Sequence, residues 1–182
     1  MGVEIEKKYR LPREREEELR RRLVRVAAAE RGHEVFEENT IYDGPGLDPH
    51  RRVLRLRRAG ARAILTFKER YHSESAIKHQ REEETEVSDA AALAAILEAI
   101  GYRRALVYEK RRSTWTVAGA EVVIDELPFG LFMEIEGTEE EIVEAERLLG
   151  LQDAEAEHAP YPELTARHGK KTDGVVEARF ES

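Results

Sequence analysis

The chain has 182 residues, 37% of them charged and 41% hydrophobic, and its 30 basic and 38 acidic side chains give a formal net charge of −8. The acidic balance argues against a nucleic-acid partner bound through bulk charge, and the absence of cysteine excludes a disulfide scaffold, a thiolate zinc site and a cysteine nucleophile. No apolar run approaches the roughly 20 residues of a membrane helix, and the strand-like N-terminus does not resemble a signal peptide. We therefore expect a cytoplasmic protein with no membrane partner.

The first half of the chain has the pattern of strands interrupted by a helix. A strand at 3–10 is followed by a helix at about 13–31, in which Leu19, Leu23 and Val26 recur at helical spacing and which Gly32 ends. Further strands are predicted at 34–43, 51–58 and 62–70, with loops at 44–50 and 70–80.

The second half repeats this alternation. A strand at about 81–87 precedes a helix with Ser88 as its N-cap and Gly101 at its end. Later elements are strands at 104–117, 120–127 and 131–137, a helix at 138–150 and a short helix at 161–169. Roughly eight strands with three or four interspersed helices predict an antiparallel α+β fold or a closed barrel rather than a βαβ array. We expect a single domain over 1–182, with its core at about 3–168 and a tail, 169–182, that the pattern does not place.

The charged residues of the strands are sorted by sign. Residues two apart in a strand share a face. On this basis three strands carry acidic pairs and two carry basic pairs: Glu4/Glu6, Glu82/Glu84 and Glu134/Glu136 against Arg55/Arg57 and Lys110/Arg112. Lys8, Lys68 and Asp125 are further charges on such strands. A solvated face explains any one pair, but surface strands usually intersperse the two signs, so the set favours a shared interior.

If the helices cover the apolar faces of the strands, the charged faces point inward. Burying so much charge in a dry interior would be prohibitive, so the interior must hold water, metal ions and an anion. Carboxylates are oxygen ligands suited to Mg²⁺ or Mn²⁺, while arginine and lysine suit a row of phosphate oxygens. The pattern therefore indicates a site for a metal–polyphosphate complex.

These motifs resemble those of the CYTH superfamily, the triphosphate tunnel metalloenzymes. The opening "VEIEKKYRL" carries the E-x-E-x-K signature, and "LRLRR", "LTFK", "REEETEV", "YEKRR", "VVIDEL", "LFMEIEG" and "YPEL" follow in the family's order. The resemblance covers residues 3 to about 168 and implies an eight-stranded antiparallel β-barrel, the tunnel, with helices packed on its outside. The family includes thiamine triphosphatases, inorganic triphosphatases and class IV adenylyl cyclases.

The resemblance also implies roles for individual residues. Its metal-site carboxylates correspond to Glu4, Glu6, Glu134 and Glu136, with Asp125, Glu82 and Glu84 beside them, for Mg²⁺ or Mn²⁺. Its phosphate ligands correspond to Lys8, Arg55, Arg57, Lys68, Lys110 and Arg112, and Glu4, Glu6 and Lys8 would take part in catalysis. Glu83 stands where the family often has an apolar residue, so a register slipped by one, with Arg81 and Glu83 inward, is the alternative for this strand.

Three functions fit these residues. The first is metal-dependent hydrolysis of a small-molecule triphosphate, inorganic triphosphate or thiamine triphosphate, by a water that the metal or Lys8 orients. The second is a class IV adenylyl cyclase that converts ATP to cyclic AMP and pyrophosphate, for which the sequence specifies no adenine pocket. The third is a non-catalytic sensor of polyphosphate or a nucleotide, which leaves the carboxylates without a purpose unless metal intervenes. Hydrolysis by a monomer or homodimer is the hypothesis that we favour.

Overall fold

The computed structural model describes residues 2–26, 29–48, 50–70, 78–152 and 154–181, with the side chains of 2–4, 33, 70 and 78–80 outside the description. The strands that build the main sheet are β1 (Gly2–Leu11), β2 (Ala29–Asp43), β3 (Arg52–Ala59), β4 (Arg62–Arg70), β5 (Lys78–Glu86), β6 (Arg103–Val117), β7 (Ala120–Leu127) and β8 (Gly130–Glu136). Two short strands follow near the C-terminus, β9 (Lys170–Thr172) and β10 (Val175–Ala178). The helices are η1 (Arg13–Arg15), α1 (Glu16–Arg25), α2 (Ala90–Ala99), α3 (Glu139–Leu149) and α4 (Tyr161–His168).

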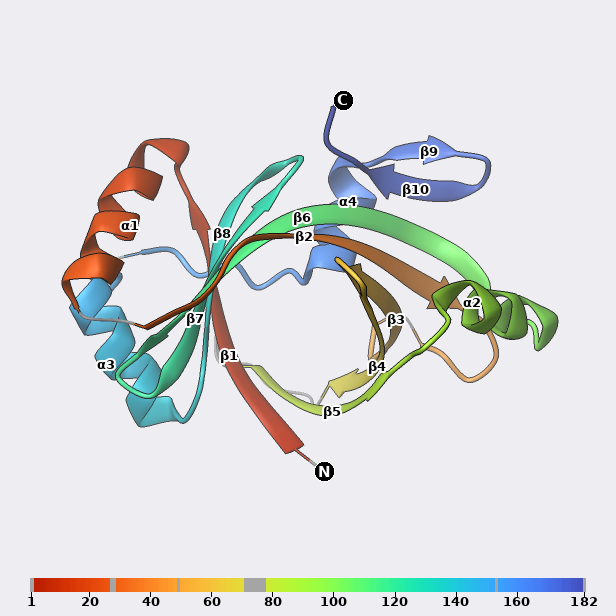
Figure 1. The fold of residues 1–182 in the computed structure, drawn as a ribbon, viewed down its shortest axis with the longest axis horizontal. Coiled ribbons are helices and arrows are strands. Elements are labelled where there is room, and N and C mark those ends of the chain that lie inside the picture. The colour runs from red at the N-terminus through yellow and green to blue at the C-terminus, as the bar shows by residue number, and fades with distance from the viewer. Residues whose placement is uncertain (1, 27–28, 49, 71–77, 153, 182) are drawn as a thin grey trace.

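The first eight strands form a closed antiparallel ring. Their order is β2-β3-β4-β5-β1-β8-β7-β6, and a pairing between β2 and β6 closes the ring (Figure 1). This confirms the predicted eight-stranded antiparallel barrel with helices outside. Closure gives β1 and β8 a shared interior with β3 and β6, although these strands are distant in sequence.

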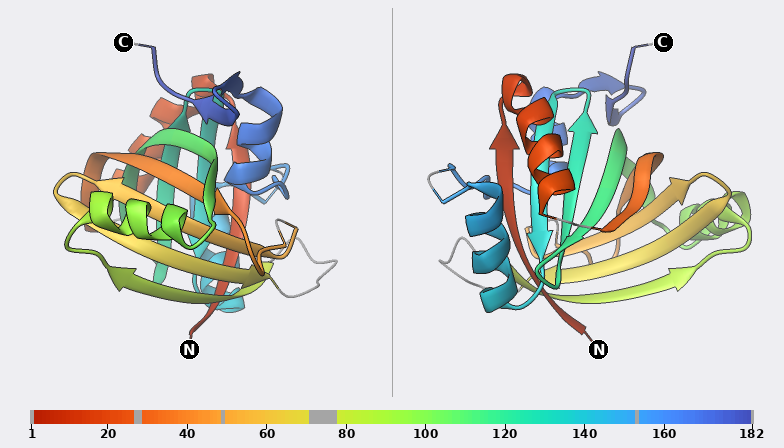
Figure 2. Two further views of the ribbon diagram at one scale, coloured as in Figure 1. Left: turned by 90° about the vertical axis from the view of Figure 1, so that its right-hand side faces the viewer. Right: turned by 60° about the vertical axis from the view of Figure 1, so that its left-hand side comes forward.

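Apolar side chains on the outer faces of the strands pack under the helices. Helices α1 and α3 cover β1, β7 and β8 over one cluster, which includes Tyr9, Leu23, Ile135 and Leu149, and α2 covers β3 and β4 at the other side through Leu56 and others (Figure 2). Because strand side chains alternate, covering the apolar faces turns the charged faces inward.

Two helix boundaries differ from the prediction. Helix α1 ends at Arg25 rather than near residue 31, and Gly32 lies within β2, where bulges interrupt the pairing with β6. Ala29 and Glu30 pair with residues of the long strand β6. This strand pairing overrides the helical pattern predicted for them. The N-cap of α2 is Asp89 and not Ser88, because the Asp89 carboxylate accepts hydrogen bonds from the backbone N–H groups of Ala91 and Ala92.

The unplaced tail adds to the sheet. Strand β10 pairs in parallel with β6 at residues 106–108, on the edge that β7 leaves uncovered, and β9 pairs antiparallel with β10. Arg179 then forms ion pairs with Glu38 and Glu109, two outward-facing carboxylates that lie opposite each other on β2 and β6. The arginine lies between two like charges that would otherwise repel. Among the described helices, none has the length and apolar character needed to cross a membrane.

Candidate functional site

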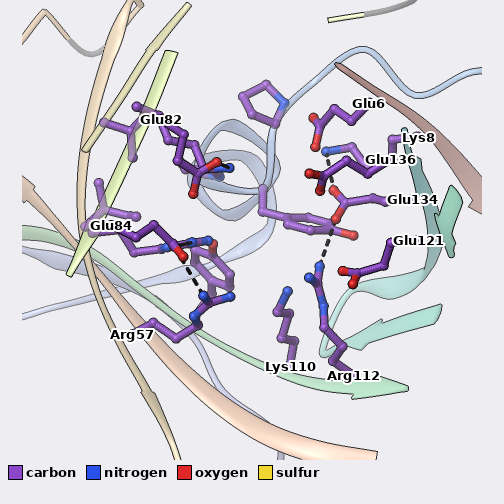
Figure 3. A pocket seen from close by; sticks show the side chains of 18 residues that line it. Glu6, Lys8, Arg57, Glu82, Glu84, Lys110, Arg112, Glu121, Glu134 and Glu136 are labelled. Atoms are coloured by element: carbon purple, nitrogen blue, oxygen red, sulfur yellow. Dashed lines mark hydrogen bonds and ion pairs between the residues drawn. The ribbon is translucent and has the colours of Figure 1, made fainter. Parts of the chain in front are cut away.

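The barrel interior holds a cavity of about 310 Å³ lined mainly by charged side chains (Figure 3). Its lining includes all six cations predicted as phosphate ligands: Lys8, Arg55, Arg57, Lys68, Lys110 and Arg112. It also includes five of the carboxylates predicted at the metal site: Glu6, Glu82, Glu84, Glu134 and Glu136. The side chain of Glu4 lies outside the described residues. The structure thus brings together residues from β1, β3, β4, β5, β6 and β8.

The basic wall, defined here as Arg55 and Arg57 of β3 and Lys110 and Arg112 of β6, lies on two strands that flank β2 in the ring. Leu54 and Leu56 alternate with the β3 arginines and pack outward, which fixes the arginines on the inner face. Burial, and then the neighbouring Arg55, lowers the pKa of Arg57 from its ordinary value. The crowding of cations on this wall suits a polyanionic ligand.

Glu37 on β2 lies between the two halves of the basic wall. Its carboxylate is 3.3 Å from the Lys110 ammonium and 3.9 Å from the Arg57 guanidinium, and the residue is only 4% exposed. Burial by itself would raise the pKa of Glu37, but Lys110, Arg112 and Arg57 outweigh it and lower the pKa. Glu37 is therefore an ionised counter-charge that stabilises the cations around it.

Asp125 is the second buried counter-charge, and it is absent from the cavity lining. Its Oδ1 accepts from Arg112 Nε at 2.7 Å, and its Oδ2 accepts from Arg112 at 2.5 Å, from Lys110 at 3.2 Å and from Tyr161 Oη at 2.9 Å. Burial opposes ionisation, but Arg112 and then Lys110 overcome it and hold the pKa of Asp125 well below its ordinary value. Both oxygens of Asp125 thus have protein donors, and the residue is fully buried.

The acidic wall, defined here as Glu6, Glu121, Glu134 and Glu136, lies on the adjacent strands β1, β8 and β7. Glu136 is paired directly with Glu6 on one side and with Glu121 on the other. Carboxylates directly opposite one another repel unless a cation intervenes. Figure 3 shows these side chains converging on one side of the cavity, across from Arg57 and Glu84.

The acidic wall fits a divalent metal by its donor chemistry. Mg²⁺ and Mn²⁺ take oxygen ligands, and Mg²⁺ typically uses one or two carboxylates and completes its shell with waters and substrate phosphate. Within the described residues, no three acidic or histidine side chains are close enough to form a complete protein cage. The wall therefore suits an ion that arrives with, or is completed by, a phosphate ligand.

Several cations of the cavity are paired with its carboxylates. The Lys8 ammonium lies 3.5 Å from Glu134, and Arg112 donates to Glu134 at 2.8 Å. The Lys68 ammonium lies 2.6 Å from Glu82. Lys8 and Glu134 are directly paired on β1 and β8, so Lys8 extends from the strand that also carries part of the acidic wall.

The strand 81–87 adopts the first of the two predicted registers. Glu82 and Glu84 line the cavity, and Glu84 lies 3.3 Å from Arg57 and 3.5 Å from Arg55. Arg81 and Glu83 hydrogen-bond to each other on the opposite face. Pairing with Thr66 and Lys68 of β4 decides this register, since both partners face the cavity side of the sheet.

Glu37, Glu121, Tyr108 and Tyr161 belong to the site, and reasoning from the sequence did not assign them to it. Glu121 had a usable signal, because it shares a face with the predicted residue Asp125, whereas no predicted site residue lay on the strand of Glu37. Tyr108 is 2% exposed and lines the cavity. Trp115, on the same strand, is buried in the core.

The comparison with known protein families shows which family the chain belongs to. The family model of the CYTH domain matches residues 2–159. The chain belongs to the CYTH domain family. No curated protein sequence matches this CYTH chain.

Solved structures share the fold over nearly their whole length. The PH1012 protein of Pyrococcus horikoshii OT3 is 26% identical with a TM-score of 0.75, covering 88% of this chain and 98% of that one. A candidate adenylate cyclase from Vibrio parahaemolyticus is 22% identical with a TM-score of 0.76, covering 91% and 98%. HpAC1 from Hippeastrum, a candidate adenylyl cyclase described as having a dominant triphosphatase activity, is 21% identical with a TM-score of 0.61, covering 86% and 90%. At these identities the last two support the fold alone.

Proposed function

We propose that this CYTH protein hydrolyses a small-molecule triphosphate in a reaction that depends on a divalent metal. The observation that carries the proposal is the single cavity in which a basic wall and an acidic wall meet. Cations alone would suffice to bind an anion, and carboxylates alone would repel it. Only a ligand that combines phosphates with metal makes use of both walls.

The basic wall would bind and orient the phosphates. Arg55 and Arg57 present guanidinium groups from β3, and Lys110 and Arg112 add charge from β6. Phosphoryl transfer needs mainly positioning and neutralisation of charge, and fixed cations supply both. Asp125 is a positioning residue in this proposal, since it holds Arg112 and Lys110 from beneath.

The acidic wall would hold Mg²⁺ or Mn²⁺ through Glu6, Glu134 and Glu136, with Glu4 as a further ligand expected from the sequence. When bound, the metal would neutralise phosphate charge and favour deprotonation of water. Lys8 is 2% exposed and pairs with Glu134. We therefore assign Lys8 to the terminal phosphate or to the orientation of the attacking water.

A second, smaller cavity bears on the substrate. It has a volume of about 160 Å³ and shares Ile41, Val53 and Pro162 with the charged cavity, so the two adjoin. Its other lining includes Leu47 and Leu106. Because these apolar residues lie beside the charged Asp43 and Arg52, the cavity suits the organic part of a triphosphate ester, which favours thiamine triphosphate or a nucleoside triphosphate over inorganic triphosphate.

Product analysis tests the proposal. The purified protein is incubated with Mg²⁺ or Mn²⁺ and, separately, with thiamine triphosphate, ATP and inorganic triphosphate, and the products are resolved by phosphorus NMR. Orthophosphate and a diphosphate product, both lost on addition of EDTA, are expected. Formation of cyclic AMP and pyrophosphate from ATP would show that the protein catalyses the cyclase reaction and not hydrolysis. Metal-dependent binding with no turnover would instead support a sensor.

A further inference from the structure

Tyr161 contributes to the site from outside the barrel strands. It is the first residue of α4 and lies beyond residue 159, where the match to the CYTH model ends. Pro160 precedes it and Pro162 follows it, so two fixed φ angles restrict the backbone on either side. The side chain is 6% exposed and lines the charged cavity.

Three charged groups of the cavity region contact this one side chain. The Lys8 ammonium lies over the ring, 4.1 Å from its centroid, and the Lys110 ammonium lies 5.5 Å from the same centroid. The hydroxyl donates to Asp125 Oδ2 at 2.9 Å. The ring therefore contacts a cation from β1 and a cation from β6, while its hydroxyl contacts the carboxylate from β7 that also holds Lys110.

The ring itself is held in place by aromatic neighbours. Phe132 contacts it edge-on with centroids 5.5 Å apart, and Tyr108 lies tilted at 6.1 Å. Leu164 and Ala178 belong to the same buried cluster, so α4 and the C-terminal strand β10 support the ring. A side chain fixed in this way can fix others.

We propose that Tyr161 is a positioning residue that holds the ammonium groups of Lys8 and Lys110 in the orientation that receives phosphate. An aromatic ring attracts a desolvated cation through its quadrupole and adds no net negative charge. A carboxylate in the same place would hold the lysines equally well, but it would repel the phosphate oxygens. Tyr161 thus stabilises buried cations without competing with the anion, a conclusion that rests on the proposed triphosphate site.

The test separates the ring from the hydroxyl. Tyr161→Phe keeps the ring and loses the hydrogen bond to Asp125, whereas Tyr161→Leu loses both. Binding of inorganic triphosphate is measured by calorimetry in EDTA, and KM and kcat are measured with metal present. We expect the dissociation constant to rise about threefold for the phenylalanine variant and about thirtyfold for the leucine variant, with KM following it more closely than kcat.

The matched control is Tyr102→Phe, because the Tyr102 hydroxyl donates to the Pro45 carbonyl away from the cavity. This variant should bind triphosphate and hydrolyse the substrate as the unaltered protein does. Binding by Tyr161→Leu within twofold of the unaltered protein would overturn the proposal. If Tyr161→Leu binds triphosphate more weakly in EDTA but the unaltered protein hydrolyses no triphosphate, the positioning role of Tyr161 is supported and the proposed hydrolysis is wrong.

A spectroscopic readout covers the case in which the leucine variant fails to fold. A lysine Nζ lying 4.1 Å from a ring centroid places its neighbouring methylene protons in the ring-current field of Tyr161. Lysine Hε resonances shifted upfield are therefore expected in the unaltered protein and in Tyr161→Phe, which keeps the ring. Spectra of both proteins without any such shifted lysine would overturn the proposal.

Discussion

The two walls of the cavity differ in how their charges are supported. On the basic wall, Lys110 and Arg112 are held by Asp125, which is 0% exposed, and Lys110 is held by Glu37, which is 4% exposed. On the acidic wall, Glu136 is exposed and has a glutamate directly opposite on each neighbouring strand. Lys110 and Arg112 thus have buried counter-charges, while Glu136 lies between two further carboxylates, and Glu134 pairs with Lys8 and Arg112 from within the cavity.

This difference separates what folding provides from what a ligand must provide. Buried carboxylates fix the phosphate-binding groups as part of the folded structure, so the basic wall is preorganised. On the acidic wall, Glu136 faces Glu6 and Glu121, and a divalent ion would relieve the repulsion among these carboxylates on binding. The basic wall should therefore depend on protein counter-charges for stability, and the acidic wall should matter for metal binding with little effect on folding.

The largest effect is expected when the support of the basic wall is removed. Asp125→Asn deletes the charge that holds Arg112 and Lys110, leaving buried cations under-compensated. We expect the free energy of unfolding to fall by about 3–5 kcal/mol, measured by urea denaturation. Glu126→Gln is the matched control, because the adjacent Glu126 pairs with Arg111 and Arg13 on the other face and should cost less than about 1 kcal/mol. Equal losses for the two variants would contradict a preorganised basic wall.

The acidic wall is tested by Glu6→Gln. The substitution keeps the size of the side chain and removes one carboxylate ligand, so we expect Mn²⁺ affinity and metal-dependent turnover to fall about tenfold to a hundredfold. The urea midpoint without metal should change little. Calorimetric titration with Mn²⁺ in the presence of triphosphate measures the first effect.

The control for this variant is Glu140→Gln in the exposed first turn of α3, which should leave metal affinity unchanged. If Glu6→Gln destabilised the protein as strongly as Asp125→Asn while Mn²⁺ affinity stayed constant, the proposed contrast between the walls would be wrong.

A smaller effect is expected from one arginine of the basic wall. Arg57→Ala removes a phosphate ligand that should act on substrate and transition state alike, so KM should rise about tenfold with kcat nearly constant. Arg58→Ala is the matched control, since the adjacent Arg58 points outward and pairs with Glu38. Steady-state kinetics measures both variants. A fall in kcat with an unchanged KM would assign Arg57 to the transition state alone.

The smallest effect concerns an ion cluster on the outer face. Burial would raise the pKa of Glu38, but Arg179 and then Arg58 outweigh it, so the folded-state pKa is lowered. The stability that ionised Glu38 gives the folded protein is therefore present above the unfolded-state pKa of about 4.3, and it is lost as the pH falls through the lower folded-state pKa. Glu38→Gln should lower stability at about pH 7 by less than about 1 kcal/mol, and the difference should vanish at acid pH.

Urea denaturation of both proteins across this pH range provides the measurement. A stability difference that grew as the pH fell would contradict the assigned direction of the pKa shift. Because this cluster is outside the cavity, hydrolysis by Glu38→Gln at neutral pH should match that of the unaltered protein.

The sequence predicted the barrel well because its signal is local. Alternation with period two depends only on neighbouring residues, so Arg55 with Arg57, and Glu134 with Glu136, could be assigned to shared faces before any strand was placed. The helix near residues 13–31 was less well predicted, since pairing with β6 extended β2 back to Ala29. Strand pairing between distant segments can override a local pattern.

What the sequence determined by itself was therefore which charges lie together on a face, and the family signature added that these faces line one interior. The tertiary structure decided which charges reach the cavity and which support it from beneath. Asp125 lies below the lining, Glu37 joins β3 to β6, and Tyr161 enters from α4. Each of these roles depends on contacts between segments far apart in the chain. Such contacts arise from closure of the sheet and docking of the C-terminal helix, which no local spacing encodes.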